Sequence, residues 1–191
     1  MVKILAFLVL GMASLGCGAQ TVSVQPVEVE ARVGLAVPMG GYHGGKTEVG
    51  GALGVELRYN FDNTPFDAGM LLDLSCAMRS YERNGHNPEQ NNRTLAWAVV
   101  GDYNLRQGSK VNPFAGLGIG AGFNDVVGVA AYPTSGVAPV FIPRIGVELI
   151  RHIRVTVSAN ITRKGYNNLS FTIGGVIGGR PKKRVSPDIG K

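Results

Sequence analysis

The chain has 191 residues, enough for one domain of ordinary size, of which 45% are hydrophobic and 17% charged. Disordered chains are poor in apolar residues and rich in charge, so this composition excludes intrinsic disorder. The 28 glycines keep no period of three, which excludes collagen, and two cysteines exclude a disulfide framework or a cysteine-based zinc site. The net charge of +6 resides mainly in residues 180–191, so the body has no basic face that would indicate nucleic-acid binding.

The first nineteen residues are predicted to be a cleaved signal peptide. Lys3 precedes an apolar run at 4–15 that is too short to span a bilayer, and small residues follow through Ala19. The expected mature start is Gln20. A buried N-terminal helix and lipidation of Cys17 stay open as alternatives, although leucine lies two rather than three positions before this cysteine.

Apolar residues then alternate with polar or small ones along nearly the whole remaining chain. In residues 27–37, Val27, Val29 and Val33 are among the apolar positions, and Glu28 and Arg32 lie between them. A period of two is the signature of a β-strand with unlike faces. Seven further segments repeat the pattern at about the ten-residue length that a membrane barrel needs: 49–61, 66–79, 94–104, 115–123, 140–149, 154–162 and 169–178.

The predicted connections differ in length between the two ends of the strands. Three connections are long: 38–48, 82–91 and 124–138. Three are short: 62–65, 106–112 and 150–152. The last, 163–167, is of intermediate length. Long loops at one end and short turns at the other are typical of outer-membrane barrels. Both ends of the barrel chain are then expected at the short-turn end, which would face the periplasm, with 180–191 as a solvated basic tail.

Alternation alone does not decide which face of each strand lies inside. A soluble lipocalin-like barrel would turn the apolar face inward, and this alternative stays open. The less apolar faces consist of Gly, Ala, Ser and Thr with scattered charges, which favours the crowded interior of an eight-stranded barrel over a water-facing surface.

Aromatic residues, Trp97 excepted, gather near the strand ends like the two girdles of a membrane barrel. Tyr59, Phe61, Phe66 and Tyr103 lie by the predicted short turns, and Phe123, Phe141 and Phe171 lie by the predicted long loops.

With this strand count, loop asymmetry and the segment Asn112-Pro113-Phe114-Ala115-Gly116-Leu117-Gly118-Ile119-Gly120, the chain resembles the small outer-membrane β-barrel domain family, of the OmpX and OmpA transmembrane-domain kind. The resemblance covers residues 27–179 and implies an all-β, eight-stranded antiparallel transmembrane barrel. The chain departs from it in two respects. A basic tail follows Gly179 where barrels of this kind often end on an aromatic residue, and we expect no peptidoglycan-binding domain of the sort that OmpA carries.

Charged residues on the less apolar faces form the most informative constellation. If even-numbered residues of the first strand point inward, the lumen receives charges of both signs: Glu28, Glu30, Arg32, Glu56, Arg58, Asp73, Arg79, Asp102, Arg144, Glu148 and Arg154. Opposite charges in a narrow lumen of low dielectric can neutralise each other. We expect a salt-bridged plug that fixes strand register, with a gated ion path as the alternative.

Pairing strands across two of the predicted connections also predicts which of these charges lie opposite each other. Pairing across 150–152 sets Glu148 opposite Arg154, and pairing across 38–48 sets Glu28 opposite Arg58. The same register sets Glu30 opposite Glu56, with Arg32 on the diagonal. Because like charges directly opposite repel each other, Arg32 is the expected keystone of the plug.

Candidate catalytic chemistry is sparse. His86 with Ser80 and Glu82 is the best group for an outer-membrane lipid-modifying enzyme, but no fixed spacing supports a catalytic triad. His43 and His86 lack a carboxylate pair at metal-ligand spacing, and His152 lies in a predicted short turn. Glycines at 116–120 match a dinucleotide fingerprint superficially, yet that motif needs a following helix. No catalytic residue, metal or cofactor is predicted.

The sequence therefore predicts a signal peptide at 1–19, a barrel at 20–179 and a periplasmic tail at 180–191. The expected protein is non-enzymatic, resides in the outer membrane of a Gram-negative bacterium, and has a structural, surface-interaction or minor transport role. The expected partners are outer-membrane lipid, lipopolysaccharide and the barrel-assembly machinery. We expect a monomer that binds no nucleic acid. The lipid-modifying enzyme and a soluble lipocalin-like binding barrel in the periplasm stay open as alternatives.

Overall fold

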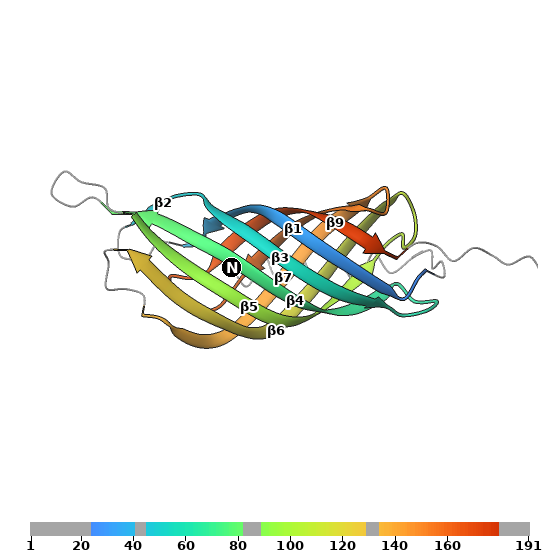
Figure 1. Cartoon of the computed structure of the whole chain (residues 1–191), viewed down its shortest axis with the longest axis horizontal. Coiled ribbons are helices and arrows are strands. Elements are labelled where there is room, and N and C mark those ends of the chain that lie inside the picture. The colour runs from blue at the N-terminus through green and yellow to red at the C-terminus, as the bar shows by residue number, and fades with distance from the viewer. Residues whose placement is uncertain (1–23, 41–44, 82–88, 129–133, 180–191) are drawn as a thin grey trace, which may run out of the picture.

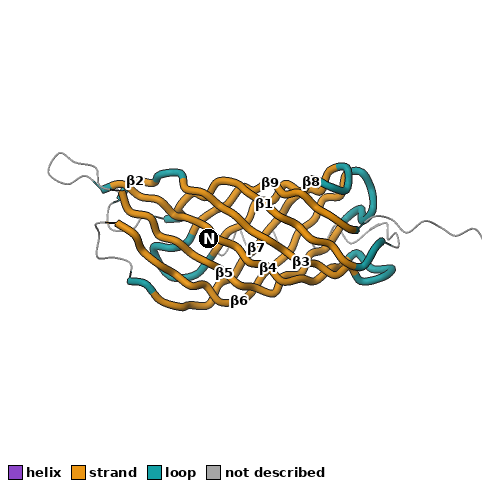
Figure 2. Tube along the Cα trace, viewed as in Figure 1, coloured by secondary structure: helices purple, strands orange, loops and turns teal. Residues whose placement is uncertain are grey.

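The structure, a computed structural model, describes residues 24–40, 45–81, 89–128 and 134–179. In these ranges nine strands form one antiparallel sheet, eight of them long and β2 only two residues long (Figures 1 and 2). They are β1 (Val27–Pro38), β2 (Lys46–Thr47), β3 (Gly50–Asn60), β4 (Phe66–Ser80), β5 (Glu89–Asn104), β6 (Val111–Gly128), β7 (Gly136–Leu149), β8 (Ile153–Asn160) and β9 (Asn168–Gly178). Within the described residues no helix is long and apolar enough to cross a membrane.

The eight long strands close into a barrel. Each pairs with its neighbour in chain order, and β1 pairs with β9 from Glu28 opposite Gly178 to Pro38 opposite Asn168. Figure 1 shows this seam where the blue β1 lies beside the red β9. The short β2 extends the sheet from β4 beyond the end of β3. The predicted eight-stranded antiparallel barrel is therefore confirmed.

The apolar faces of the strands point away from the lumen. On β1, Val27, Val29 and Val33 are 51%, 43% and 55% exposed, whereas Glu28, Glu30 and Arg32 are buried. Thirty large hydrophobic residues in the described chain are exposed in this way. A lipocalin-like barrel buries its apolar residues inside, so its arrangement is the reverse of the one found here.

An uncharged outward belt runs along the length of the barrel. On β4 it comprises Phe66, Ala68, Met70, Leu72, Leu74 and Cys76, which are all exposed or half-buried. Ten residue steps span about 33 Å along a strand, or about 25 Å along the barrel axis at a tilt of about 40°. This height matches the apolar band of an outer-membrane barrel.

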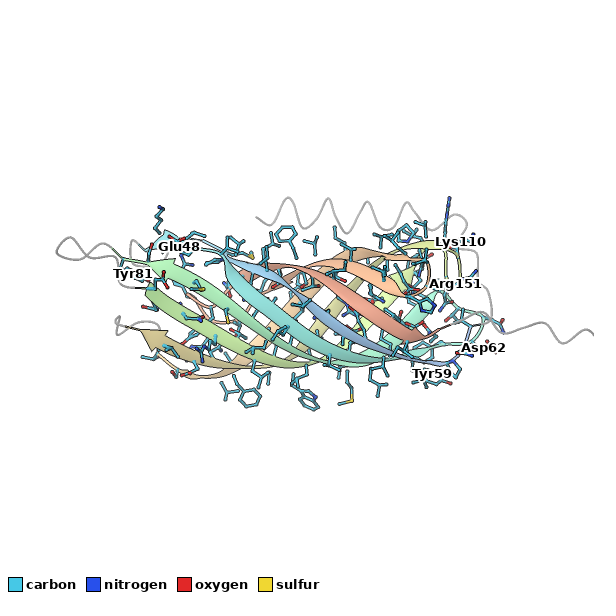
Figure 3. The ribbon with its side chains drawn as sticks, turned by 45° about the horizontal axis from the view of Figure 1, so that its top comes forward. Glu48, Tyr59, Asp62, Tyr81, Lys110 and Arg151 are labelled. Atoms are coloured by element: carbon cyan, nitrogen blue, oxygen red, sulfur yellow. The ribbon has the colours of Figure 1, made fainter. Side chains whose placement is uncertain are left out.

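The two ends of the barrel carry different residues. Glu48 and Tyr81 lie at the long-loop end, and Asp62, Lys110 and Arg151 lie at the short-turn end (Figure 3). At the short-turn end the predicted aromatic residues make two edge-on pairs, Tyr59 with Phe61 at 5.6 Å and Phe66 with Tyr103 at 5.2 Å between ring centroids. β1 begins and β9 ends at the same end (Figure 1).

Several strands are longer than the sequence predicts. Residues 89–91 belong to β5, 124–128 to β6 and 136–138 to β7, so the predicted loops 82–91 and 124–138 are shorter than expected. Residues 46–47 form β2 inside the predicted loop 38–48. Apolar and polar residues do not alternate in these extensions, because 89–91 are all polar, Val126 and Val127 are adjacent, and 136–138 are Gly-Val-Ala.

Candidate functional site: an ion-paired lumen

The eleven predicted lumen charges are brought into the barrel interior by six strands. Ten of them are buried and Glu148 is half-buried. Nine meet in one connected cluster on β1, β3, β4, β5, β7 and β8: Glu28, Glu30, Arg32, Glu56, Arg58, Asp73, Asp102, Arg144 and Arg154. Alternation places these residues inward, because the side chains of successive strand residues point to opposite faces.

Arg58 on β3 binds three carboxylates. Its Nη2 donates to Oε2 of Glu28 at 2.8 Å and its Nη1 donates to Oε2 of Glu30 at 3.0 Å. Nη1 also lies 3.5 Å from Oε1 of Glu56. The register sets Glu30 directly opposite Glu56, so this guanidinium lies between two carboxylates that would otherwise repel each other.

Arg144 on β7 joins opposite walls of the barrel. Its Nη2 donates to Oε1 of Glu56 on β3 and to Oδ2 of Asp102 on β5, both at 2.8 Å. Its Nε donates to Oδ1 of Asp102 at 2.7 Å. The planar fork of arginine suits two carboxylates at once, because its donors lie in fixed directions in one plane.

Arg154 on β8 adds a third arginine to the same carboxylates. It donates to Asp102 and lies 3.6 Å from Oε2 of Glu30. Its guanidinium carbon is 3.5 Å from the ring centroid of Phe114 on β6, in a cation–π contact. The sequence analysis missed Phe114 as a partner, although its position in the inward-facing register of β6 could have indicated it.

Glycines leave the space that these side chains occupy. A Cβ at Gly54 would meet Nε of Arg32 at 2.7 Å and Oδ1 of Asp73 at 3.1 Å. A Cβ at Gly174 would meet Oε1 of Glu30 at 2.5 Å, and one at Gly116 would overlap Oδ1 of Asp102. Each of these glycines faces the lumen beside a charged residue, so the high glycine content serves the ion-pair cluster as well as barrel curvature.

The predicted register is confirmed, but not every lumen charge pairs with the residue opposite it on the ladder. Glu148 lies opposite Arg154 on the ladder, yet no ion pair joins them, because Arg154 turns across the lumen toward Asp102. Glu30 pairs with Arg58 and Arg154, whereas Arg32 pairs with Glu56, at 3.6 Å between Nη1 and Oε2, and not with Glu30. Arg32 is therefore not the cation that lies between these two carboxylates. It lies opposite Gly54, and the missing side chain there lets its Nη2 reach Asp73 on β4 at 2.7 Å.

Uncharged polar residues fill the lumen toward both ends. At the short-turn end, Asn60 donates to Glu28 and accepts from Gln107, which the β5–β6 turn folds inward. Toward the long loops, Asn160 donates to Asp73 and Asn168 donates to Ser75. Sequence reasoning missed these amides because it followed charge, although they share the inward faces.

Arg79 and Ser80 make their contacts outside the nine-residue cluster. Arg79 is buried near the long loops and donates to the carbonyl oxygen of Gly40 at 2.9 Å. Ser80 donates to Oε1 of Glu48 at 2.9 Å, while Glu82, His86 and His43 lie outside the described residues. Nδ1 of His152 is 3.3 Å from the carbonyl oxygen of Val176. Among the residues that the structure describes, no group of three His, Cys, Asp or Glu could hold a metal ion.

No protein-family model and no curated protein matches the chain. Among solved structures, Ail of Yersinia pestis in complex with the heparin analogue sucrose octasulfate is 12% identical, with 82% of this chain and 97% of that chain covered and a TM-score of 0.44. The N-terminal β-barrel domain of Pseudomonas aeruginosa OprF is 9% identical, with 81% of this chain and 99% of that chain covered and a TM-score of 0.46. Neisserial surface protein A is 10% identical, with 78% of this chain and 94% of that chain covered and a TM-score of 0.47. These are small barrels of the kind that the sequence resembles, and the barrel fold of this chain follows from its own hydrogen-bond register.

Proposed function

We propose that the protein is a non-enzymatic barrel of the bacterial outer membrane that spans the bilayer with its eight long strands and holds its long loops at the cell surface. The observation that carries this proposal is the facing of the strands, with an apolar belt outside and ion-paired charges inside. In water the described chain would expose thirty large hydrophobic side chains, whereas in lipid those of the belt would be solvated by acyl chains.

Trp97 gives a direct test of the membrane placement. It is the single tryptophan of the chain, and its side chain is 50% exposed on the outward face of β5. In vesicles, phospholipids brominated near the middle of their acyl chains are expected to quench its fluorescence, and gel mobility is expected to change on heating. Fluorescence that responds to aqueous iodide and not to the brominated lipid would contradict a bilayer-spanning barrel.

We further propose that the lumen is closed by the ion-pair cluster. Arg58, Arg144 and Arg154 reach carboxylates on other strands, and their side chains cross the interior that an ion would have to traverse. Planar-bilayer recordings of the purified barrel are expected to show no steady open state. A large steady conductance in the unaltered protein would overturn the plug and favour the gated ion path.

The domain plan belongs to the same proposal. Residues 1–19 would direct export and be removed, and β1 and β9 would place both ends of the barrel chain in the periplasm. Intact mass measurement of the protein purified from outer membranes tests the first point, because cleavage after Ala19 gives a defined mass. Lipid, lipopolysaccharide and the assembly machinery are the proposed partners of a monomer.

A further inference from the structure

Arg79 is a buried lumen cation that pairs with no acid among the described residues. It lies on the inward face of β4 near the long loops and is fully buried. None of the ion pairs between described residues includes it, in contrast to the four arginines of the cluster. A buried charge of this kind is costly, because it has lost its water and gained no counter-charge.

Most of the hydrogen-bond donors of Arg79 are unused. A guanidinium carries five N–H groups, one on Nε and two on each Nη. Nη2 donates to the carbonyl oxygen of Gly40 at 2.9 Å, whereas Nε and Nη1 are buried and have no hydrogen-bond partner. Buried donors in folded proteins are nearly always paired, so these N–H groups mark a position where an acceptor is missing.

The acidic residues nearest to Arg79 in the described chain are engaged elsewhere or face outward. Asp73, the nearest cluster acid on the same strand, is six residues away, about 20 Å along β4, and already forms an ion pair. Glu89 lies opposite Ser80, the residue after Arg79, so it belongs to the outward face. Glu48 accepts a hydrogen bond from the hydroxyl group of the same Ser80.

The described surroundings of Arg79 are uncharged and adjoin open space. Gln90 lies directly opposite on β5, Ala77 precedes Arg79 on the inward face of β4, and both are buried. Gly40, which accepts the hydrogen bond from Nη2, is itself exposed, and a Cβ there would meet no described atom within 4 Å. The unused donors therefore lie next to an exposed residue at the end of the barrel where Figure 3 labels Tyr81.

We propose that Arg79 binds a small soluble oxyanion, such as a phosphate or carboxylate group, at the long-loop mouth of the lumen. Such an anion accepts charge-assisted hydrogen bonds from the planar donors of arginine and supplies the negative charge that the described surroundings lack. Because Arg79 faces the lumen and the barrel wall separates it from lipid, a lipid headgroup is not the expected source. Alternation predicts that Arg79 faces inward, but only the assembled barrel distinguishes it from the four arginines of the cluster.

The phosphate dependence of folding tests the site in the full chain, in micelles of a maltoside detergent that carries no phosphate. A ligand that binds only the folded barrel raises the folding equilibrium constant by a factor of 1 + [L]/Kd. Phosphate replaces chloride at constant ionic strength, and urea unfolding is followed by the fluorescence of Trp97. We expect a gain of about tenfold in the unaltered protein, reached at about nine times Kd, and of less than about twofold in Arg79→Gln.

Arg93→Gln is the matched control, because Arg93 lies on β5 toward the same end of the barrel and is exposed. Phosphate also stabilises proteins in general, since it is excluded from their surface, and this part of the gain is common to all variants. Arg93→Gln is therefore expected to gain as much as the unaltered protein. Equal gains in Arg79→Gln and Arg93→Gln would overturn the proposal.

The stability of Arg79→Gln in phosphate-free buffer provides a second readout. Replacement of an unpaired buried cation by a neutral residue is expected to leave the folding equilibrium constant unchanged or to raise it. A loss of about tenfold or more, or a failure to fold, would mean that the chain itself supplies the counter-charge, and would overturn the proposal. Both measurements use micelles, so failure of the bilayer tests with Trp97 would leave this inference standing, and the reverse also holds.

Discussion

Arg144 on β7 and Glu56 on β3 are 88 residues apart in the chain and form a two-point ion pair across the lumen. Nη2 of Arg144 donates to Oε1 of Glu56 at 2.8 Å, and Nη1 donates to Oε2 at 2.5 Å. Both side chains are almost fully buried. This pair ties opposite walls of the barrel together, where backbone hydrogen bonds join only adjacent strands.

Arg144→Ala is expected to lower the free energy of unfolding by about 3–5 kcal/mol, because it leaves Glu56 and Asp102 without their shared partner in a buried site. Urea titration followed by Trp97 fluorescence measures the change. The Arg144→Leu/Glu56→Leu double variant is expected to recover part of the loss, since it removes charges of both signs. Arg106→Ala, in an exposed turn position, is the control and is expected to change the value by less than about 0.5 kcal/mol. A similar loss in the control would argue against a specific role for the pair.

Arg58→Ala is expected to destabilise the barrel more than Arg32→Ala. Arg58 lies within 3.5 Å of three carboxylates, whereas Arg32 makes one close pair with Asp73 and a longer one with Glu56. Both losses are expected to reach a few kcal/mol, the scale for removal of one partner from a buried ionic cluster. The two midpoints of urea unfolding, compared under identical conditions, decide the order. A larger loss for Arg32→Ala would show that Arg32 contributes more to the stability of the plug than Arg58, as the sequence predicts.

Gly116→Ala is expected to destabilise the barrel by about 1–3 kcal/mol or more, because the added methyl group would overlap a carboxylate oxygen of Asp102 and crowd the carbonyl oxygen of Gly101. Gly51→Ala is the matched control, since a Cβ there meets nothing within 4 Å. Heat-modifiability gels and urea midpoints compare the two variants. Equal behaviour would mean that the lumen is less tightly filled than the contacts indicate.

Ile150→Asn is expected to stabilise the barrel by about 0.5–1 kcal/mol. Ile150 and Arg151 form the two central positions of the β7–β8 turn with φ angles of 49° and 64°, a conformation in which a β-branched residue is strained. Asparagine adopts this conformation at lower cost. The urea midpoint measures the gain, and Ile153→Asn, on the adjacent strand, is the control that should show none. A lowered midpoint for Ile150→Asn would show that its outward side chain contributes more than the turn strain costs.

Cys76 tests the assigned facing in intact cells. Its side chain is half-buried, lies on the outward face of β4 and is a free thiol, so a membrane-impermeant maleimide is expected to leave it unlabelled. A Ser135→Cys substitution, at an exposed position beside β7, is expected to react readily. Mass spectrometry of the labelled protein distinguishes the two sites. Ready labelling of Cys76 from outside would reverse the assigned facing.

The fold was predictable where one face of a strand is apolar. Alternation in residues 27–37 and 66–79 placed Glu28 and Asp73 on the same side as the structure does, and pairing across 38–48 predicted the ladder that sets Glu30 opposite Glu56. Toward the long loops this alternation is lost, because 89–91 are all polar, Val126 and Val127 are adjacent, and 136–138 are Gly-Val-Ala. The ends of β5, β6 and β7 were missed for that reason.

The partners inside the lumen were less predictable than the register. Ladder pairing determines neighbours on adjacent strands, but Arg144 reaches Glu56 from the far side of the barrel. Such contacts depend on lumen diameter and on where glycines such as Gly54 leave space, and neither follows from a period of two. Asp67 shares the inward face of β4 with Asp73 and is buried, yet it was not predicted among the lumen charges.

The position of the cluster also determines when it can form during folding. Glu30 and Arg32 belong to the first strand and Arg154 to the last but one, while the β1–β9 seam joins the two ends of the sheet. An open sheet would leave these side chains hydrated, so we expect ring closure and dehydration of the arginines to occur together. Reopening the seam would have to rehydrate several buried ions together, which raises the barrier to unfolding more than it speeds folding. We therefore expect the ion-paired lumen to slow the unfolding of the closed barrel.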